Sequence, residues 1–333
     1  MKRLLIAAAV VVVVVALAAA SVAWVGWTRW TTPGPTVDTV RVLIPRGAGV
    51  KRITAILAEQ GLLRDRLDEV VFPLGVTLTD LAARLQAGEY DIPAGVRMVD
   101  IAQQLAAGAG LVQRPFTVAE GLTTPVVLDL LRAMPELDGD ITLTPPTGAL
   151  LPETYHTLRG EPRDAVVRRM MAAMEKALAE LWPTRAEGLP FTTPEQAVVL
   201  ASIVERETAV AAERPRVAAV FVNRLRLGMR LQSDPTVIYG LRPETGTLDR
   251  ALLRSDLEAE HPWNTYVIAG LPPSPIANPG RESLAAVLNP ADTKDLYFVA
   301  DGTGGHAFAR TLDEHNRNVA QWRRVQRERK AGE

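Results

Sequence analysis

Cysteine is absent from this sequence of 333 residues. Its absence excludes a disulfide framework and every metal site that requires a thiolate ligand. Histidine is scarce, and the four in the chain lie far apart with none at H-x-x-x-H spacing, so we predict no metal site and no cofactor. Net charge is almost absent too, at −1, with 37 Lys and Arg against 38 Asp and Glu. The overall charge of the chain therefore does not favour nucleic acid as a partner.

A long apolar run is present at the N-terminus. Residues 4–28 carry no charge, and residues 6–20 consist only of Ala, Val, Ile and Leu. Roughly 20 such residues in a helix span the hydrocarbon core of a bilayer. Trp24, Trp27 and Trp30 follow at the far end, where indole rings favour the membrane interface. We therefore predict a short cytoplasmic tail and a transmembrane anchor over residues 1–30.

Basic residues set the expected orientation of this anchor. Lys2 and Arg3 precede the apolar run, and such residues stay on the cytoplasmic side. We expect a single pass through the cytoplasmic (inner) membrane, with the N-terminus inside and the rest of the chain extracytoplasmic. The alternative is a cleaved signal peptide, since residues 18–20 (AAA) resemble a cleavage site. Against it, the apolar run exceeds the roughly 7–15 residues of a signal h-region. Residues 31–37 (TTPGPTV) are expected to form a linker.

A repeated pattern follows the linker. Each repeat is a short β-prone run, a turn that ends in Gly, and an amphipathic helix. The runs and turns are residues 42–47, 90–95 and 116–121. Such units resemble LysM-type modules, small folds that bind glycan containing N-acetylglucosamine. The alternative is an α+β packing domain without a ligand.

The predicted fold class is α+β. With 47% apolar and 23% charged residues, the composition is that of a folded protein, and the length suggests about two domains beyond the anchor. We predict a LysM-like strand-turn-helix subdomain region over residues 38–147 and a mixed α+β catalytic domain over residues 148–333.

The clearest helix start in the second domain lies at residues 193–196 (TPEQ). It combines an N-cap, a Pro at the first helical position and a capping box. The helix continues through residues 197–208 and is so apolar that we expect it to be largely buried. At about 100° per residue its two acids separate. Glu205 lies with Ser202 and Arg206 on the polar side of the helix, which we expect to be solvated. Glu207 lies in the apolar arc.

The position of Glu207 has a chemical consequence. A carboxylate in an apolar wall is costly to ionise, so its pKa should rise until it is protonated near neutral pH. General acid catalysis at a glycosidic oxygen requires such a group. The alternative is a structural ion pair, for which Arg214, Arg224 and Arg226 are the available partners.

Polar side chains suited to sugar hydroxyls and amides follow in two segments, residues 229–240 and 262–266. The candidate substrate-binding residues are Gln232, Asp234, Thr236, Tyr239, Asn264 and Tyr266. Ordinary turn chemistry is the alternative, because Asp234 precedes a proline and Asn264 can simply fix a loop.

Several motifs together resemble the YceG-like (MltG) endolytic murein transglycosylases. They are residues 201–208 (ASIVERET), 223–225 (NRL), 231–240 (LQSDPTVIYG), 264–266 (NTY), 270–273 (GLPP), 297–302 (YFVADG), 305–306 (GH) and 315–316 (HN). The resemblance covers nearly the whole chain, and the 200–240 block is highly specific. In that family the second Glu of E-x-E-T is catalytic, and it maps onto Glu207. The sequence departs from the family pattern at two places, and both concern the sugar-binding subsites. Residues 150–155 (LLPETY) lack the aromatic residues that the family often has there, and Trp263 stands where the family commonly has Tyr.

The resemblance implies a lyase that acts on peptidoglycan glycan strands. Glu207 would protonate the oxygen between N-acetylmuramic acid and N-acetylglucosamine, and the muramyl N-acetyl group would support the developing positive charge. The deprotonated Glu207 would then take the proton of the C6 hydroxyl, which closes a 1,6-anhydro ring. The implied role is to terminate nascent strands, with peptidoglycan synthases as candidate partners. The rival hypothesis is a non-catalytic peptidoglycan-binding scaffold of the wall synthesis machinery.

Overall fold

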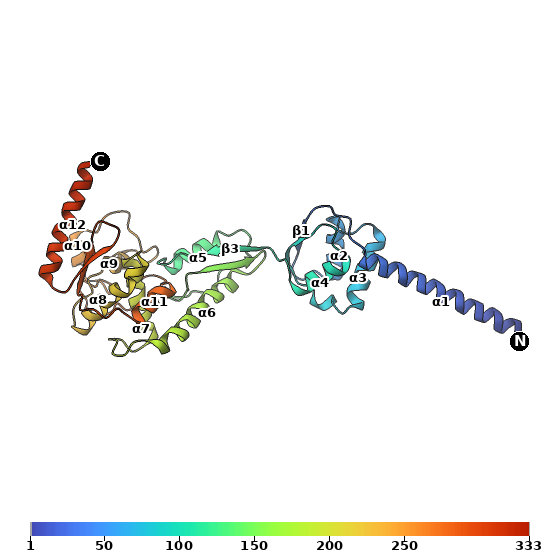
Figure 1. Ribbon diagram of the computed structural model, residues 1–333, viewed down its shortest axis with the longest axis horizontal. Helices are drawn as coiled ribbons and strands as arrows, with labels where there is room; N and C mark the ends of the chain where they lie inside the picture. The colour runs from blue at the N-terminus through green and yellow to red at the C-terminus, as the bar shows by residue number, and fades with distance from the viewer. Residues whose placement is uncertain (1, 333) are drawn as a thin grey trace. The chain divides into compact units, whose positions relative to one another are not determined.

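The computed structural model describes residues 2–332 and is a mixed α+β structure with one long N-terminal helix (Figure 1). Met1 and Glu333, the outer limits of the predicted regions, lie outside the described residues. The chain forms two compact units. The first comprises Met1–Arg114, Glu136–Asp138 and His156–Glu161, and the second comprises Pro115–Pro135, Gly139–Tyr155 and Pro162–Glu333. The coarse α+β prediction is confirmed, whereas the domain boundaries given above stay predictions.

The N-terminal helix α1 spans Lys2–Thr31. Its residues Leu5–Thr31 are long and apolar enough to cross a membrane, and residues 5–25 of this stretch are exposed. This confirms the predicted apolar helix. The three tryptophans do not behave alike, however, because Trp24 and Trp27 are exposed while Trp30 is buried. Trp30 packs on Phe72 with ring centroids 6.0 Å apart, so α3 covers its ring, and only Trp24 and Trp27 keep their rings exposed.

The rest of the first unit is a small α+β core. Its elements are β1 (Val40–Ile44), α2 (Val50–Glu59), α3 (Arg66–Leu78), a 3-10 turn (Ala82–Arg84), β2 (Gly88–Ile92) and α4 (Met98–Ala107). Strands β1 and β2 pair antiparallel, with Val40 opposite Ile92 and Val42 opposite Tyr90. The helices bury Leu57, Phe72 and Leu105 against this ribbon because their apolar residues recur at helical spacing.

The predicted linker is tied to this unit. The N–H of Gly34 donates to the carbonyl of Val96 at 3.0 Å, and the N–H of Gly95 donates to the carbonyl of Thr36 at 2.8 Å. A Cβ on Gly34 would lie 2.6 Å from the Val96 carbonyl oxygen, so the close approach needs glycine.

The three repeats do not form one sheet. The first two supply β1 and β2, which pair with each other, whereas the third supplies β3 (Gln113–Thr117), which pairs with β4 (Thr154–Leu158). The helix of the third repeat, α5 (Thr124–Arg132), belongs to the second unit. Similar local sequences therefore enter different sheets.

The second unit is mainly helical. Its further elements are α6 (Arg163–Leu181), a 3-10 turn (Trp182–Thr184), α7 (Pro194–Glu207), a 3-10 turn (Ala211–Glu213), α8 (Arg214–Arg226), α9 (Asp234–Leu241), α10 (Arg254–Glu258), α11 (Arg281–Leu288), β5 (Tyr297–Ala300), β6 (His306–Ala309) and α12 (Leu312–Gly332). The predicted capping box at Thr193 and Gln196 is present. From Ala197 to Val204 every residue of α7 is buried, because α8 and α11 pack against it. This buried helix carries Glu207 at its C-terminal end.

Candidate active site

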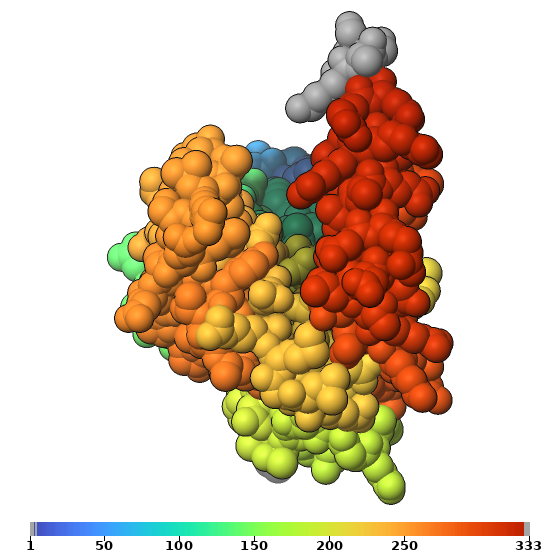
Figure 2. All heavy atoms as spheres, turned by 90° about the vertical axis from the view of Figure 1, so that its left-hand side faces the viewer, coloured from blue at the N-terminus to red at the C-terminus, as the bar shows by residue number. Residues whose placement is uncertain are grey.

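A cavity of 490 Å³ opens in the second unit near the C-terminal end of α7. Figure 2 looks onto this face and shows a hollow between α12, in red, and the segment in orange that precedes α11, with residues in yellow at its floor. The lining residues are Glu207, Phe221, Arg224, Leu231, Gln232, Asp234, Tyr266, Tyr297, Phe298, Val299, Leu312 and His315. They come from α7, α8, α9, β5, α12 and the loops before α9 and α11.

Glu207 is the last residue of α7, and Thr208 leaves the helix in an extended conformation with φ −139°. The helix therefore ends where its carboxyl group enters the cavity. The hydroxyl of Ser233 donates to Oε1 of Glu207 at 2.5 Å. Ser233 is itself held, because its N–H donates to Oγ1 of Thr265 at 2.9 Å. One carboxylate oxygen is thus fixed by a buried hydroxyl.

The surroundings of Glu207 favour its neutral form. Burial raises the pKa of Glu207 from its ordinary 4.5 to about 7, and the nearby charge of Asp234 also raises it. The Ser233 hydrogen bond, then His306 and Arg224, act in the opposite direction and favour the carboxylate. A group balanced in this way can both give and accept a proton near neutral pH.

None of the described basic residues forms a salt bridge with Glu207. The three arginines named as alternative partners are engaged elsewhere. Arg214 pairs with Glu120 and Glu205, and the guanidinium of Arg224 donates to the carbonyls of Leu296 and Leu231. Arg226 donates to the carbonyl of Gly188. The structural ion pair is therefore not formed at Glu207.

Glu205 has a different environment from the one its sequence predicts. Its side chain is only 4% exposed, so the expected solvated position is wrong. One oxygen lies 3.2 Å from Arg214, and the other accepts the N–H of Gly280 at 2.8 Å. The helical spacing separated the two acids correctly, but the segment around Gly280 and the start of α8 cover the polar side of α7.

Three predicted substrate-binding residues line the cavity. Gln232 lies in the left-handed region, with φ 52°, and its N–H donates to the carbonyl of Thr265 at 3.1 Å. The hydroxyl of Tyr266 donates to Oδ1 of Asp234 at 2.6 Å. Burial and Asp234 raise the pKa of Tyr266, so the phenol stays protonated and keeps its donor. An amide, a carboxylate and an aromatic ring therefore share one wall.

The other three predicted residues are buried beside the cavity without lining it. The hydroxyl of Thr236 bonds to the carbonyl of Ser233 and to Thr265. The ring of Tyr239 packs edge-on to Trp263, with centroids 5.7 Å apart. The amide of Asn264 donates to the carbonyls of Asp256, Leu257 and Ala259. Each of them fixes the backbone or the packing behind the wall.

Several residues in or beside the cavity were assigned no catalytic or substrate-binding role from the sequence. Ser233 and Arg224 lie inside motifs of the family resemblance, but nothing in their spacing predicts contact with the cavity. Tyr297 stacks on His315 at 5.2 Å, and the Arg224 guanidinium lies 5.1 Å from the Tyr297 ring. Burial lowers the pKa of His315, which leaves it neutral near pH 7. The only sequence signals for the part of the cavity formed by Tyr297 and His315 are the short motifs at 297–302 and 315–316.

Comparisons with a family model and with individual proteins give the same kind of relative. The model of the YceG-like family matches residues 42–321. The chain is 30% identical over 309 residues to an endolytic murein transglycosylase of Bacillus subtilis (strain 168), covering 84% of this chain and 83% of that protein. It is 32% identical over 177 residues to an endolytic murein transglycosylase of Streptococcus pneumoniae (serotype 2, strain D39), covering 52% of this chain and 32% of that protein.

A solved structure is similar as well. The crystal structure of a YceG-like protein from Listeria monocytogenes aligns with a TM-score of 0.50 and 27% sequence identity. The alignment covers 84% of this chain and 99% of that one. The likeness therefore extends over both compact units.

Proposed function

Since this chain belongs to the YceG-like family and is a peptidoglycan transglycosylase, a lyase of the cell wall, we propose that Glu207 is its catalytic acid and base. One observation carries the proposal. Glu207 ends a buried helix inside a cavity, its pKa lies at about 7, and none of the described cations forms a salt bridge with it. A carboxylate that served only a structural role here and stayed ionised would be expected to pair with a cation.

The proposed reaction uses one carboxyl group twice. Protonated Glu207 gives its proton to the oxygen between N-acetylmuramic acid and N-acetylglucosamine as the bond from that oxygen to C1 of N-acetylmuramic acid breaks. The N-acetylglucosamine side leaves as an alcohol, and the muramyl N-acetyl group supports the positive charge at C1. The carboxylate then takes the proton of the C6 hydroxyl, and the C6 oxygen bonds to C1 to close the 1,6-anhydro ring. Ser233 holds Oε1, so we assign proton transfer to Oε2.

The cavity wall suggests how the sugars are held. We propose that Gln232, Asp234 and Tyr266 contact the glycan directly, because all three line the cavity. Thr236, Tyr239 and Asn264 act behind them as positioning residues. Amide and carboxylate groups suit sugar hydroxyls, and an aromatic ring suits the apolar face of a sugar.

Location and organisation form a second part of the proposal. We propose that α1 anchors the protein in the cytoplasmic (inner) membrane with the N-terminus inside. Residues 38–147 would then form a LysM-like region that binds glycan, and residues 148–333 the catalytic domain. The pairing of the first two repeats in one ribbon supports the LysM-like part. The enzyme would cut nascent strands beside peptidoglycan synthases and so terminate their elongation.

The proposal is tested on purified full-length protein with isolated glycan strands, with products identified by mass spectrometry. The wild type is expected to release fragments with 1,6-anhydro ends. Glu207→Gln keeps the shape of the side chain but cannot cycle a proton, so we expect a loss of about 10²–10⁴-fold in a folded protein.

Glu205→Gln is the matched control, two residues away on the same helix. It should retain far more activity per folded molecule, because its carboxylate faces Arg214 and Gly280 instead of the cavity. A folded Glu207→Gln variant that works near the wild-type rate would refute the assignment. A wild type that binds strands and never cuts them would support the scaffold instead.

A further inference from the structure

Helix α3 carries an apolar face that the described residues of its own unit leave exposed. Its inner side buries Val71, Phe72 and Val76 in the core of the first unit. On its outer side four large apolar residues are exposed, from 42% to 85% of each: Leu67, Val70, Leu74 and Leu78. At about 100° per residue they fall within an arc of about 80°. The polar residues Arg66, Glu69 and Thr77 occupy a separate arc.

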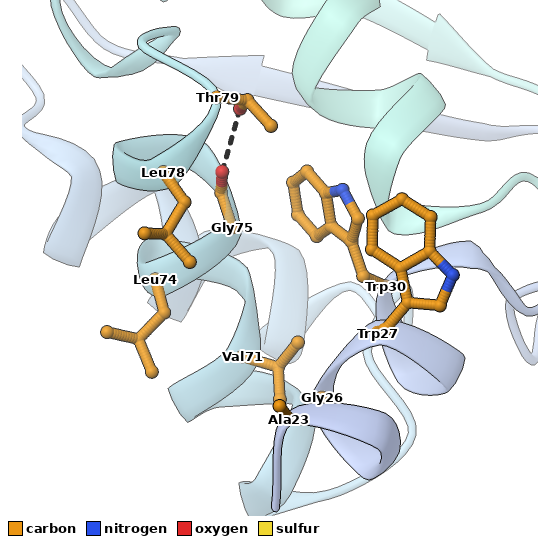
Figure 3. A pocket seen from close by; sticks show the side chains of 9 residues that line it. All are labelled: Ala23, Gly26, Trp27, Trp30, Val71, Leu74, Gly75, Leu78 and Thr79. Atoms are coloured by element: carbon orange, nitrogen blue, oxygen red, sulfur yellow. Dashed lines mark hydrogen bonds between the residues drawn. The ribbon is translucent and has the colours of Figure 1, made fainter. Parts of the chain in front are cut away.

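This face is continuous with the surface of α1. A pocket of 210 Å³ lies where the two helices meet, and its walls are almost wholly apolar (Figure 3). Ala23, Gly26, Trp27 and Trp30 line it from α1, and Val71, Leu74, Gly75, Leu78 and Thr79 line it from α3 and its end. In Figure 3, Leu74 and Leu78 lie one turn apart along the same edge of α3. Trp27, at the rim, is 65% exposed.

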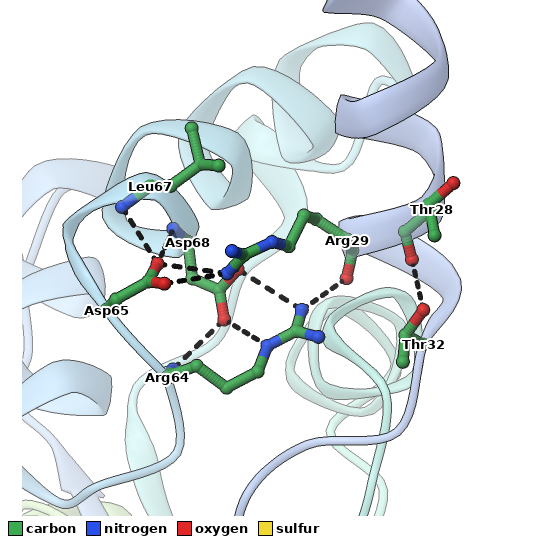
Figure 4. Close-up of polar contacts among 7 residues, drawn as sticks. All are labelled: Thr28, Arg29, Thr32, Arg64, Asp65, Leu67 and Asp68. Atoms are coloured by element: carbon green, nitrogen blue, oxygen red, sulfur yellow. Dashed lines mark hydrogen bonds and ion pairs between the residues drawn. The ribbon is translucent and has the colours of Figure 1, made fainter.

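The two helices are fixed against each other. A Cβ on Gly75 would lie 2.5 Å from the ring of Trp30, so only glycine permits this contact. The guanidinium of Arg29 lies 2.9 Å from Asp65 and 3.2 Å from Asp68 (Figure 4). Arg64 pairs with Asp68 at 2.7 Å and donates to the carbonyl of Arg29 at 2.9 Å. This network joins the end of α1 to the start of α3, so α3 keeps a fixed level along α1.

That level coincides with the expected membrane surface. About 20 helical residues span the hydrocarbon core, which counted from Leu5 ends near Trp24. The contacts of α3 lie on residues Ala23 to Trp30, which start at about that point and continue beyond it. An exposed helix surface with one apolar arc and one polar arc is typical of helices that lie in the plane of the interface.

We propose that α3 is an interfacial helix, embedded at the headgroup–acyl boundary of the leaflet where α1 ends. Leu67, Val70, Leu74 and Leu78 enter the acyl region, and Glu69 faces water. The inference rests on the proposed membrane anchor and adds a second, fixed contact with the bilayer. The bilayer is the occupant because the exposed face continues the apolar surface of the anchor at the level of its exposed tryptophans.

The absence of cysteine makes a direct test simple. Single cysteines replace Val14, Glu69, Leu74 or Leu78 in the full chain and carry an environment-sensitive nitrobenzoxadiazole label. Each protein is reconstituted in nanodiscs of phosphatidylethanolamine and phosphatidylglycerol. Blue shift, quenching by nitroxide-labelled lipid and quenching by aqueous iodide are then measured. Leu78 is 85% exposed at the helix end, so labelling there leaves the fold undisturbed.

We expect the labels at Leu74 and Leu78 to be blue-shifted, and several-fold more strongly quenched by nitroxide lipid than the label at Glu69. The label at Glu69, on the polar arc of the same helix, should respond to iodide instead. Lipid contact at Val14 together with water contact at Leu74 and Leu78 would overturn the inference and leave the anchor intact. That result is expected if this face is covered by a protein partner, which the nanodiscs do not contain. Water contact at Val14 would refute the anchor, and the interfacial helix with it. Release of anhydro products is measured separately, so neither result is confused with failure of the catalytic assignment.

Discussion

At the scale of single residues, the protonation state of Glu207 governs the proposed chemistry. The free enzyme needs the neutral acid, and its pKa of about 7 places the change within the physiological range. We predict that kcat/KM is highest below pH 7 and falls as the pH rises through about 7. Initial rates of anhydro product release between pH 5 and 9 provide the measurement. A profile flat to pH 9 would contradict the role of Glu207 as the acid.

The same pKa makes a prediction about stability. Between the ordinary pKa of 4.5 and about 7 the folded protein keeps a proton on Glu207 that the unfolded chain has lost. The free energy of unfolding therefore decreases as pH rises through this window, by up to about 3 kcal/mol from this group. Glu207→Gln removes this decrease, so at pH 8 the variant should be more stable than the wild type, with little difference near pH 4. Urea unfolding at both pH values measures it.

Glu205→Gln should act in the opposite direction. It weakens a buried contact to Arg214 and to the N–H of Gly280, so it is expected to destabilise the fold by about 1.5–3 kcal/mol at pH 8. Equal effects of the two variants in these experiments would mean that the two carboxylates occupy equivalent environments.

Ser233 offers a separate test of the site. Its hydroxyl favours the carboxylate form of Glu207 through the hydrogen bond to Oε1. Ser233→Ala should therefore raise the pKa of Glu207, move the alkaline limb of the pH–rate profile upward, and lower the maximal rate because the acid is less well positioned. Ser274→Ala is the control, since Ser274 accepts from Trp263 and does not contact Glu207. An unchanged alkaline limb in Ser233→Ala would show that this hydrogen bond has no role in proton transfer.

At the scale of elements, the loops before α9 and α11 divide their polar residues between two tasks. Gln232 faces the cavity, so Gln232→Ala should reduce turnover while the free energy of unfolding changes by less than about 1 kcal/mol. Asn264→Ala leaves three backbone carbonyls without their amide donor, so it should cost about 1–3 kcal/mol. Thermal unfolding and product release on the same samples measure both effects. A stable Asn264→Ala variant with lost turnover would instead make Asn264 a substrate contact.

At the scale of the whole molecule, the chain combines an apolar helix with two compact units. We predict that a reporter active only in the cytoplasm is silent when fused after Glu333. The same reporter placed before Met1 should be active, because Lys2 and Arg3 keep that end inside. Strong activity from the C-terminal fusion would show that the orientation is the reverse of the predicted one. The catalytic domain would then lie in the cytoplasm, away from its substrate in the cell wall.

The sequence by itself determined the features that depend on local periodicity and composition. The apolar run of α1, the capping box at Thr193 and the opposite directions of Glu205 and Glu207 all follow from spacing within one helix. These features are predictable because a helix repeats every 3.6 residues regardless of its neighbours.

Only the tertiary structure decided which groups meet and which are covered by distant segments. Glu205 was expected in solvent, but its burial depends on Gly280, 75 residues away in the chain. The hydrogen bond of Ser233 to Glu207 and the stacking of Tyr297 on His315 likewise join separate elements. Strand pairing is non-local in the same way, so three similar repeats entered two different sheets. The sequence specifies each helix and strand by its own pattern, whereas the surroundings of each side chain depend on how those elements pack.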